Sequence, residues 1–202
     1  MTGREPWVVG VTGASGTPYA KAVLAGLLDA GLPVDLVVSQ AARLTLLDET
    51  GVRWHDDDAS LTQWLGRTGD VRHWAPRDLA AGPSSGSYRT RGMVVVPATT
   101  AAVAGIALGI SKDLLQRAAD VTLKERRPLV VVPREMPLGR STLVHLLALH
   151  DAGAIVAPAS PGFYAGAESA QDLADFVAGK VLDLMGVEHG LTARWTGTLR
   201  NS

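Results

Sequence analysis

The chain has 202 residues, of which 47% are hydrophobic, and its formal net charge at pH 7 is -1. This length and apolar content suit a single domain with a substantial core, and the near-zero net charge gives no electrostatic case for binding nucleic acid or an anionic membrane. Cysteine is absent, which excludes disulfides and a cysteine nucleophile, and neither a signal core nor a membrane-length segment is present, so we expect a soluble cytoplasmic protein.

Short apolar runs alternate with amphipathic stretches along most of the chain. The runs predict five buried strands, at 7–11, 34–38, 93–96, 129–132 and 154–157. The stretches between them predict helices at about 17–30, 41–50, 113–127, 141–150 and 169–185, with a short helix near 61–65. Strands that alternate with helices indicate an α/β fold with a doubly wound parallel sheet. We expect one domain over residues 1–202.

Three stretches depart from this alternation. Residues 52–91, which include three tryptophans, predict a variable excursion that ends in a long polar loop. Residues 98–109 form a segment of small side chains, and 186–202 form a C-terminal tail. The aspartates at 56–58 suggest a metal site, but consecutive aspartates in a loop usually face solvent, and the five histidines lack metal-ligand spacing. We therefore predict no metal site.

The residues that follow the five predicted strands are small, hydroxyl-bearing or charged. They are 13–15, Ser39, 97–100, Arg134 with Glu135, and 158–164. Because parallel strands end at one edge of a sheet, these residues predict a cofactor cleft there. The glycine-rich segment 10–16 allows a tight turn and offers helix-start N–H groups to a phosphate, although a turn without a ligand is the alternative. Ser39 stands where an NAD site would have an acidic residue, which favours a mononucleotide such as FMN.

Several charged or aromatic residues permit both a structural and a functional interpretation. One predicted helix face holds Asp113, Arg117, Asp120 and Lys124, which form either a solvated ladder of ion pairs or part of a site. Lys180 is expected on the core stripe of the last helix, so it either extends to water or meets an anion. Glu49 taken alone reads as a surface carboxylate. Trp195 could anchor the tail or cover an apolar ligand.

Four motifs together resemble the UbiX/Pad1 family of flavin prenyltransferases. They are Val-Thr-Gly-Ala-Ser-Gly at 11–16 with Tyr19, the segment 117–130, Pro-Arg-Glu-Met-Pro-Leu at 133–138, and Pro-Gly-Phe-Tyr at 161–164. The resemblance runs from about residue 7 to 200 and is weakest over 52–91. It implies a Rossmann-like, flavodoxin-type fold and a homo-oligomer, typically a dodecameric shell. It also implies a metal-independent transfer of the dimethylallyl group from dimethylallyl phosphate to N5 and C6 of reduced FMN, giving prenylated FMN for a UbiD-type decarboxylase.

The resemblance also implies roles for individual residues. The FMN site would comprise Gly13, Ala14, Ser15, Ser39, Thr99, Thr100, Ala101, Ala102 and Arg134. The prenyl phosphate would be held by Lys124, Tyr164 and Lys180 with Arg117 close by, and Trp195 would cover the dimethylallyl chain. Glu135 would act as an acid for the departing phosphate, Glu49 would take the proton lost from flavin C6, and Ser15 would join them in catalysis. A departing phosphate needs clustered cations, so we expect these cations to gather near Ser15.

Two departures from the family pattern keep other functions open. Where the family usually reads Pro-Cys-Ser-x-x-Thr, this chain has Pro-Ala-Thr-Thr-Ala-Ala at 97–102, and Lys112-Asp113 stands where Asp-Asn or Asn-Asn is usual. These changes motivate a second hypothesis, a non-catalytic FMN-binding or scaffold paralogue. A third is a flavin-dependent cysteine decarboxylase, but its histidine near the first helix and its Pro-x-Ser-Ala-Asn segment are both missing. Whether the donor is the monophosphate or the pyrophosphate is left open.

Overall fold

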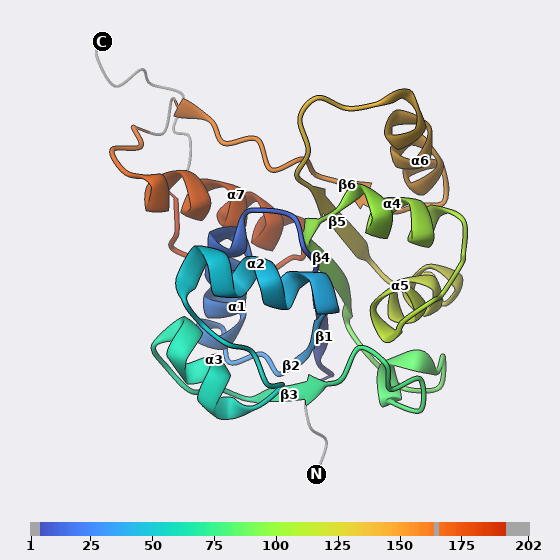
Figure 1. The fold of residues 1–202 in the computed structure, drawn as a ribbon, viewed down its shortest axis with the longest axis horizontal. Helices are drawn as coiled ribbons and strands as arrows, with labels where there is room; N and C mark the ends of the chain where they lie inside the picture. The colour runs from blue at the N-terminus through green and yellow to red at the C-terminus, as the bar shows by residue number, and fades with distance from the viewer. Residues whose placement is uncertain (1–4, 164–165, 193–202) are drawn as a thin grey trace.

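The computed structural model describes residues 5–163 and 166–192. Within these ranges, six parallel strands form one sheet in the order β3-β2-β1-β4-β5-β6 (Figure 1). The strands are β1 (Trp7–Val11), β2 (Val34–Val38), β3 (Val71–Trp74), β4 (Gly92–Ala98), β5 (Leu129–Pro133) and β6 (Ile155–Val156). The order reverses between β1 and β4. This pair of strands therefore forms the topological switch point of the sheet, where ligands of such folds bind.

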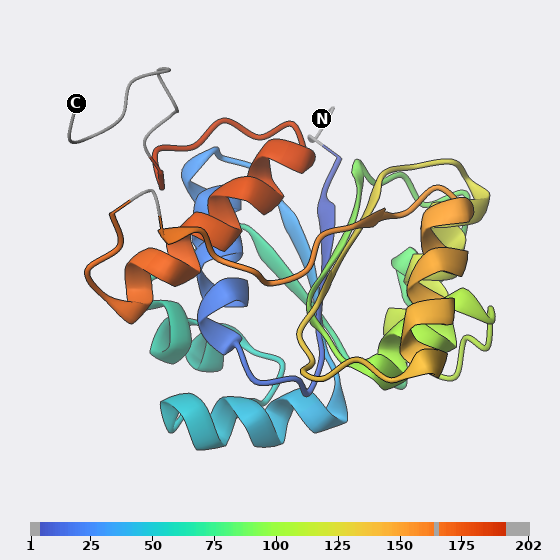
Figure 2. The ribbon, with the colours of Figure 1, turned by 90° about the horizontal axis from the view of Figure 1, so that it is seen from above.

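Helices cover both faces of the sheet. They are α1 (Thr17–Asp29), α2 (Gln40–Thr50), α3 (Asp58–Leu65), α4 (Thr100–Ala107), α5 (Leu114–Lys124), α6 (Arg140–Asp151) and α7 (Ala170–Leu184), with a 3₁₀ turn η1 (Gly82–Ser84). Figure 2 shows α1, α3 and α7 on one side of the sheet and α4, α5 and α6 on the other. Helix α2 lies across the edge formed by the carboxyl ends of the strands (Figure 2). Each face has its own buried apolar cluster, so the sheet separates two cores.

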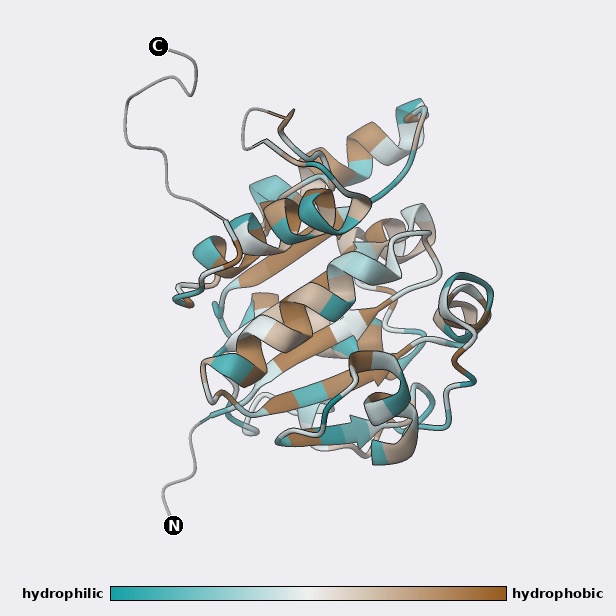
Figure 3. Ribbon diagram, turned by 90° about the vertical axis from the view of Figure 1, so that its left-hand side faces the viewer, coloured by the Kyte–Doolittle hydropathy of each residue, from teal (hydrophilic) through white to brown (hydrophobic). Residues whose placement is uncertain are grey.

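The central strands are buried on both faces, which explains why they read as continuous apolar runs and not as alternating patterns. Strand β1 is in register with β2 and β4, pairing Trp7 with Val34 and with Gly92. Because the strands start level, their carboxyl ends also lie at one edge. The edge strand β3 is only partly buried, and hydrophilic residues interrupt it (Figure 3).

The doubly wound parallel sheet is as predicted, but strand β3 was not expected. The polar character of residues 52–91 predicts a loop there, and Arg72 and His73 leave β3 without a continuous apolar run. Tertiary contacts hold the strand: it pairs with β2, and Trp74 Nε1 donates to Asp35 Oδ1 at 2.9 Å. The other five strands have the flavodoxin order, and β3 extends it to the six-strand Rossmann order.

Helix α4 was also missed, because its small residues gave no amphipathic period. Thr99 begins the helix by accepting a hydrogen bond from the Ala102 N–H at 3.1 Å. The small side chains allow close packing: a Cβ on Gly105 would stand 2.3 Å from Nε2 of Gln116 on α5. Among the described residues, no helix is both long and apolar enough to cross a membrane.

The aspartates at 56–58 have structural roles. Asp56 accepts hydrogen bonds from Arg43 and from Trp54 Nε1, Asp57 caps α3, and Asp58 pairs with His73 at 3.0 Å. Within the described parts of the chain, no group of three or more potential ligand residues is arranged to hold a metal ion.

Candidate functional site

At the switch point, the buried side chain of Thr12 links the ends of β1 and β4. Thr12, at the end of β1, donates its hydroxyl to Pro97 O at 2.7 Å and accepts from the Thr99 N–H at 2.8 Å. Its backbone N–H also donates to Pro97 O, at 3.2 Å. These three bonds fix the ends of β1 and β4 side by side. The starts of α1 and α4 are thereby held at one place on the rim.

A cavity of about 250 Å³ opens at this rim, which we call the switch-point cavity. Its lining comes from four segments: Thr12, Gly13, Ser39, Gln40, Ala41, Thr99, Ala101, Ala102, Lys112, Asp113, Leu115 and Gln116. Ser39 caps α2 through Ala42 N at 3.1 Å, as Thr99 caps α4. The N-termini of α2, α4 and α5 therefore border the cavity; α5 is capped by the carboxylate of Asp113, whereas α2 and α4 are capped by hydroxyls. A helix N-terminus attracts anions through its free N–H groups and its dipole.

Gly13 is required by the close approach of α2. A Cβ at this position would stand 2.6 Å from the Cβ of Ala41, closer than real side chains come. Thr45 of α2 also donates to Gly13 O at 3.1 Å. The first turn of α2 thus rests directly on the strand-to-helix turn.

A second cavity of about 420 Å³ lies beyond residues 13–16, which we call the Glu49 cavity. It is lined by Ser15, Gly16, Pro18, Tyr19, Glu49, Arg134, Pro161, Ala170, Leu173 and Ala174. Arg134, which follows β5, donates Nε to Ser15 O at 2.9 Å. The cavity thus combines a carboxylate, a guanidinium and a hydroxyl with an aromatic ring and apolar side chains.

The Glu49 carboxylate sits at the N-terminus of α1. It accepts hydrogen bonds from the Gly16 N–H at 3.0 Å, the Thr17 N–H at 2.9 Å and the Thr17 hydroxyl at 2.6 Å. Partial burial opposes ionisation, but the hydrogen bonds from Thr17, from the Ser15 side chain and from Gly16 outweigh it and lower the pKa of Glu49. The helix dipole acts in the same direction. Glu49 is therefore an ionised, oriented carboxylate at neutral pH.

This geometry corrects two predictions. Glu49 is exposed at the residue level, but its carboxylate is fixed by helix α1 and is not a free surface group. The prediction that the start of α1 offers its N–H groups to a phosphate is wrong for Gly16 and Thr17, because Glu49 already accepts from both. The starts of α2 and α4, capped by the hydroxyls of Ser39 and Thr99, also lie at the rim.

Most of the predicted FMN residues come together at the rim. Gly13, Ser39, Thr99, Ala101 and Ala102 line the switch-point cavity, while Ser15, Glu49 and Arg134 line the Glu49 cavity. Ala14 is buried, and Thr100 is the first residue of α4. Glu135 is exposed beside Arg134, and its Oε1 accepts from the Met136 N–H at 2.9 Å.

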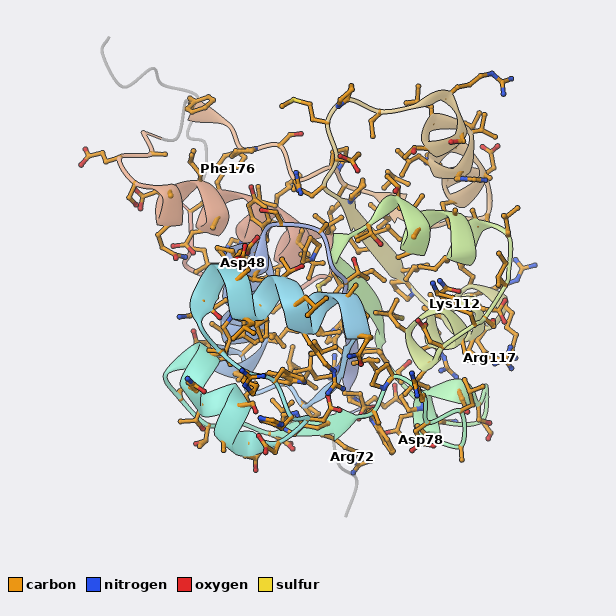
Figure 4. The ribbon with its side chains drawn as sticks, in the orientation of Figure 1. Asp48, Arg72, Asp78, Lys112, Arg117 and Phe176 are labelled. Carbon is orange, nitrogen blue, oxygen red and sulfur yellow. The ribbon has the colours of Figure 1, made fainter. Side chains whose placement is uncertain are left out.

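The predicted phosphate cations do not gather in one chain. Arg117 and Lys124 belong to α5, whereas Lys180 belongs to α7 on the opposite face of the sheet. Figure 4 shows this separation, with Arg117 far from Phe176 of α7. The prediction that these cations converge near Ser15 is therefore wrong for the single chain. Tyr164 and Trp195 lie outside the described residues.

Two helix predictions are revised for the same cations. Lys180 is exposed, because the buried stripe of α7 is Ala174, Val177, Ala178, Val181 and Leu182. On α5, Asp113 caps the helix, Arg117 pairs with Asp120 at 2.6 Å, and Lys124 pairs with the next residue, Glu125, at 2.6 Å. The ladder of ion pairs is thus only partly formed.

The sequence reasoning missed Thr12 and Gln116. Gln116 is 3% exposed, lines the switch-point cavity and accepts from the Lys112 N–H at 3.3 Å. Neither residue has a pattern of its own that predicts a role. Thr12 stands within the Val-Thr-Gly motif, which was the available signal.

Comparison with known proteins identifies the family. The flavoprotein family model matches residues 1–182. The flavin prenyltransferase UbiX of Streptomyces coelicolor is 64% identical over 208 aligned residues, covering 96% of each chain. The chain belongs to the UbiX family of flavin prenyltransferases. The family resemblance seen in the sequence motifs is confirmed.

Solved structures of UbiX proteins have the same fold. A UbiX protein (AnUbiX, PadA1) in complex with FMN and dimethylallyl pyrophosphate is 39% identical, with a TM-score of 0.87, and the match covers 96% of this chain and 99% of that one. A dodecameric FMN-dependent UbiX-like decarboxylase from Escherichia coli O157:H7 is 40% identical, with a TM-score of 0.86, covering 95% and 100%. The cysteine decarboxylase SpaF is only 16% identical with a TM-score of 0.56, so it shares the fold alone.

Proposed function

We propose that this UbiX-family chain is a flavin prenyltransferase that transfers the dimethylallyl group of dimethylallyl phosphate to reduced FMN. The observation that carries the proposal is the rim geometry: the switch-point cavity, bordered by the starts of α2 and α4, adjoins a cavity that holds Ser15, Glu49 and Arg134. The bound ligands of the AnUbiX structure support FMN as the cofactor and a dimethylallyl donor. A UbiD-type decarboxylase in the cytoplasm would receive the prenylated FMN.

The residues at the rim fit FMN. Gly13 allows the close approach of α2, which brings the Ser39 cap to the cavity, and Thr99 caps α4 at the same cavity. We assign the phosphate to these helix starts, since N–H groups and dipoles there favour an anion. The flavin ring would then lie toward Ser15, Glu49 and Arg134. Cavities of 250 and 420 Å³ are of the size that small-molecule sites have, roughly 300–1,000 Å³ in total.

Reduced FMN, when bound, supplies the nucleophilic N5 and C6 positions. The Glu49 carboxylate, ionised and held by three donors at the start of α1, is suited to accept the proton lost from C6, with Ser15 beside it. Arg134 would hold the ring edge from the end of β5, because its Nε already contacts Ser15 O. Glu135, the next residue, would give a proton to the departing phosphate. Tyr19 and Leu173 keep part of the cavity apolar, which protects an allylic cation from water.

The position of Arg117 and Lys124 requires a second copy of the chain. Both belong to α5, on the opposite face of the sheet from α7, and neither lines the Glu49 cavity, so within one copy they do not meet a donor bound near Lys180. In a homo-oligomer, a neighbouring copy can present them. Exposed apolar side chains support such an assembly: Leu143, Val144 and Leu147 on α6 and Leu108 with Ile110 after α4. The dodecameric relative is consistent with a shell of this kind.

The alternative is a non-catalytic FMN-binding paralogue, favoured by Ala102 and Lys112 at the switch-point cavity. The two functions are separated by anaerobic incubation with reduced FMN and dimethylallyl phosphate, followed by mass analysis of the released flavin. A prenyltransferase adds a five-carbon unit, and Glu49→Gln or Glu135→Gln abolishes the addition while Asp48→Asn on the same helix as Glu49 does not. Bound but unmodified flavin from the wild-type protein would establish the alternative instead.

A further inference from the structure

Arg127, just after α5, binds the loop that precedes β4. We call residues 84–90 the serine loop, after Ser84, Ser85 and Ser87. The Arg127 guanidinium donates to Tyr88 O at 2.8 Å, to Gly86 O at 2.8 Å and to Thr90 Oγ1 at 3.3 Å. Two backbone carbonyls that are separated by one residue are thus held by one planar group. The fork of donors on arginine fits such a pair, whereas a lysine ammonium reaches them only as a point charge.

The serine loop also lies against two cationic side chains of α5, Lys124 and Arg117. A Cβ on Gly86 would stand 2.8 Å from Lys124 Nζ and 2.2 Å from Glu125 Oε1. From the other side, Arg117 donates Nε to Ser84 O at 3.1 Å. The loop backbone is therefore in contact with both cations of α5, Arg117 and Lys124. A shift of the loop would change the shape of the surface beside Lys124.

The far end of the loop is fixed to the sheet. Tyr88 OH donates to Asp35 Oδ2 at 2.9 Å, and Asp35 is only 1% exposed on β2. Burial together with this hydrogen bond raises the pKa of Tyr88 to about 12, so the phenol stays a donor. The middle of the loop, from Gly86 to Tyr88, is held by the hydrogen bonds of Arg127 to its two carbonyls.

We infer that Arg127 is a positioning residue of the donor-phosphate subsite: it holds the serine loop against Lys124 so that the cation and the loop present one preformed surface to the phosphate. This inference rests on the proposed function, in which Arg117 and Lys124 bind the prenyl phosphate. Arg127 would not itself touch the dimethylallyl phosphate, because both terminal nitrogens of its guanidinium, Nη1 and Nη2, already bind carbonyls of the loop. The proposed FMN site is the switch-point cavity, which Arg127 does not line, so FMN binding should be independent of Arg127.

The test compares Arg127→Gln with Arg126→Gln, which removes the same charge one residue earlier. Arg126 is exposed, and no side-chain hydrogen bond or ion pair is found for it within the described residues. For Arg127→Gln we expect the KM for dimethylallyl phosphate to rise about tenfold or more, the factor for loss of one charge-assisted hydrogen bond of roughly 1.4 kcal/mol. The Kd of FMN should change less than about twofold, and millimolar ethylguanidinium should restore part of the KM. Arg126→Gln should keep the wild-type KM.

A second readout needs no turnover. Hydrogen exchange of the amides at 84–90 should become faster in Arg127→Gln and stay at the wild-type rate in Arg126→Gln. If the wild-type protein forms no adduct, the proposed function fails, while the exchange result still tests whether Arg127 holds the serine loop. Equal KM values in the two variants, or unchanged exchange in Arg127→Gln, would overturn the inference. Should Arg127→Gln not fold, Arg127→Lys replaces it, and a wild-type KM in Arg127→Lys would be equally decisive against the inference.

Discussion

Replacing Glu49 with glutamine should destabilise the protein in a pH-dependent manner. Glu49→Gln removes the charge at the N-terminus of α1 and replaces one of its two accepting oxygens with an NH₂ group, so that either the Gly16 or the Thr17 N–H loses its acceptor. A carboxylate at a helix N-terminus stabilises by 0.3–1 kcal/mol at exposed positions and up to roughly 2 kcal/mol when partly buried. Because Glu49 is exposed at the residue level, we expect a loss of about 1 kcal/mol in the free energy of unfolding at pH 7.

The sign of the pH dependence follows from the lowered pKa. The folded-state pKa of Glu49 is below the ordinary 4.5, so its charge stabilises the protein fully above that value. As the pH falls through the folded-state pKa, the wild-type carboxyl is protonated and the stabilisation is lost. The difference in unfolding free energy between wild type and Glu49→Gln should therefore shrink as the pH is lowered below 4.5.

Urea denaturation at a series of pH values measures this difference. Asp48→Asn is the matched control, since Asp48 is an exposed carboxylate on the same helix (Figure 4) and lies outside both cavities. Asp48→Asn should change the unfolding free energy by less than about 0.5 kcal/mol, as usual for surface substitutions. A Glu49→Gln loss that is the same at all pH values, or that equals the loss in Asp48→Asn, would refute the assignment of Glu49 as the anchor of α1.

Three further predictions concern the rim and the cations. Thr12→Val keeps the shape of a side chain that is 3% exposed but leaves its hydrogen-bond partners at the switch point unsatisfied. The substitution should therefore lower the free energy of unfolding by about 1–3 kcal/mol. An unchanged urea midpoint would contradict the role of this hydroxyl. Gly13→Ala places a Cβ 2.6 Å from the Cβ of Ala41 and should displace the start of α2. Because overpacking usually costs about 1–3 kcal/mol, FMN binding in a fluorescence titration should weaken at least about tenfold. A wild-type affinity for FMN would show that α2 shifts without affecting the site. Glu125→Gln removes the carboxylate that pairs with Lys124 at 2.6 Å and so leaves Lys124 free for the phosphate. The KM for dimethylallyl phosphate in steady-state assays should fall by about twofold to fivefold, the range for a surface ion pair of about 0.5–1 kcal/mol. A higher KM would mean that Glu125 supports the subsite.

The central sheet could be predicted from the sequence because four of its strands are buried on both faces. Runs such as Leu129–Pro133 are apolar throughout, and the small or polar residues after each run mark the carboxyl edge. The same logic identified Gly13, Ser39 and Thr99, which the structure brings to one cavity. Strand β3 depends on its pairing with β2 and not on an apolar pattern of its own, so no comparable sequence signal predicts it.

The long-range contacts of the site could not be predicted. Glu49 and Gly16 are 33 residues apart, and nothing in the local pattern of α2 indicates that its last turn reaches the start of α1. Lys180 was expected at the core because the stripe of α7 was placed on Leu173 and Phe176, which are only partly buried. The separation of Lys124 from Lys180 depends on which face of the sheet each helix covers, a property of the whole fold.

A crystal structure of the protein with FMN tests the account most directly, because every functional assignment depends on where the flavin lies. The account predicts the phosphate at the starts of α2 and α4 beside Ser39 and Thr99, with the isoalloxazine edge facing Glu49 and Arg134. Electron density for the flavin at the opposite edge of the sheet, in the cavity of about 520 Å³ beside Asp35 and Arg72, would contradict it.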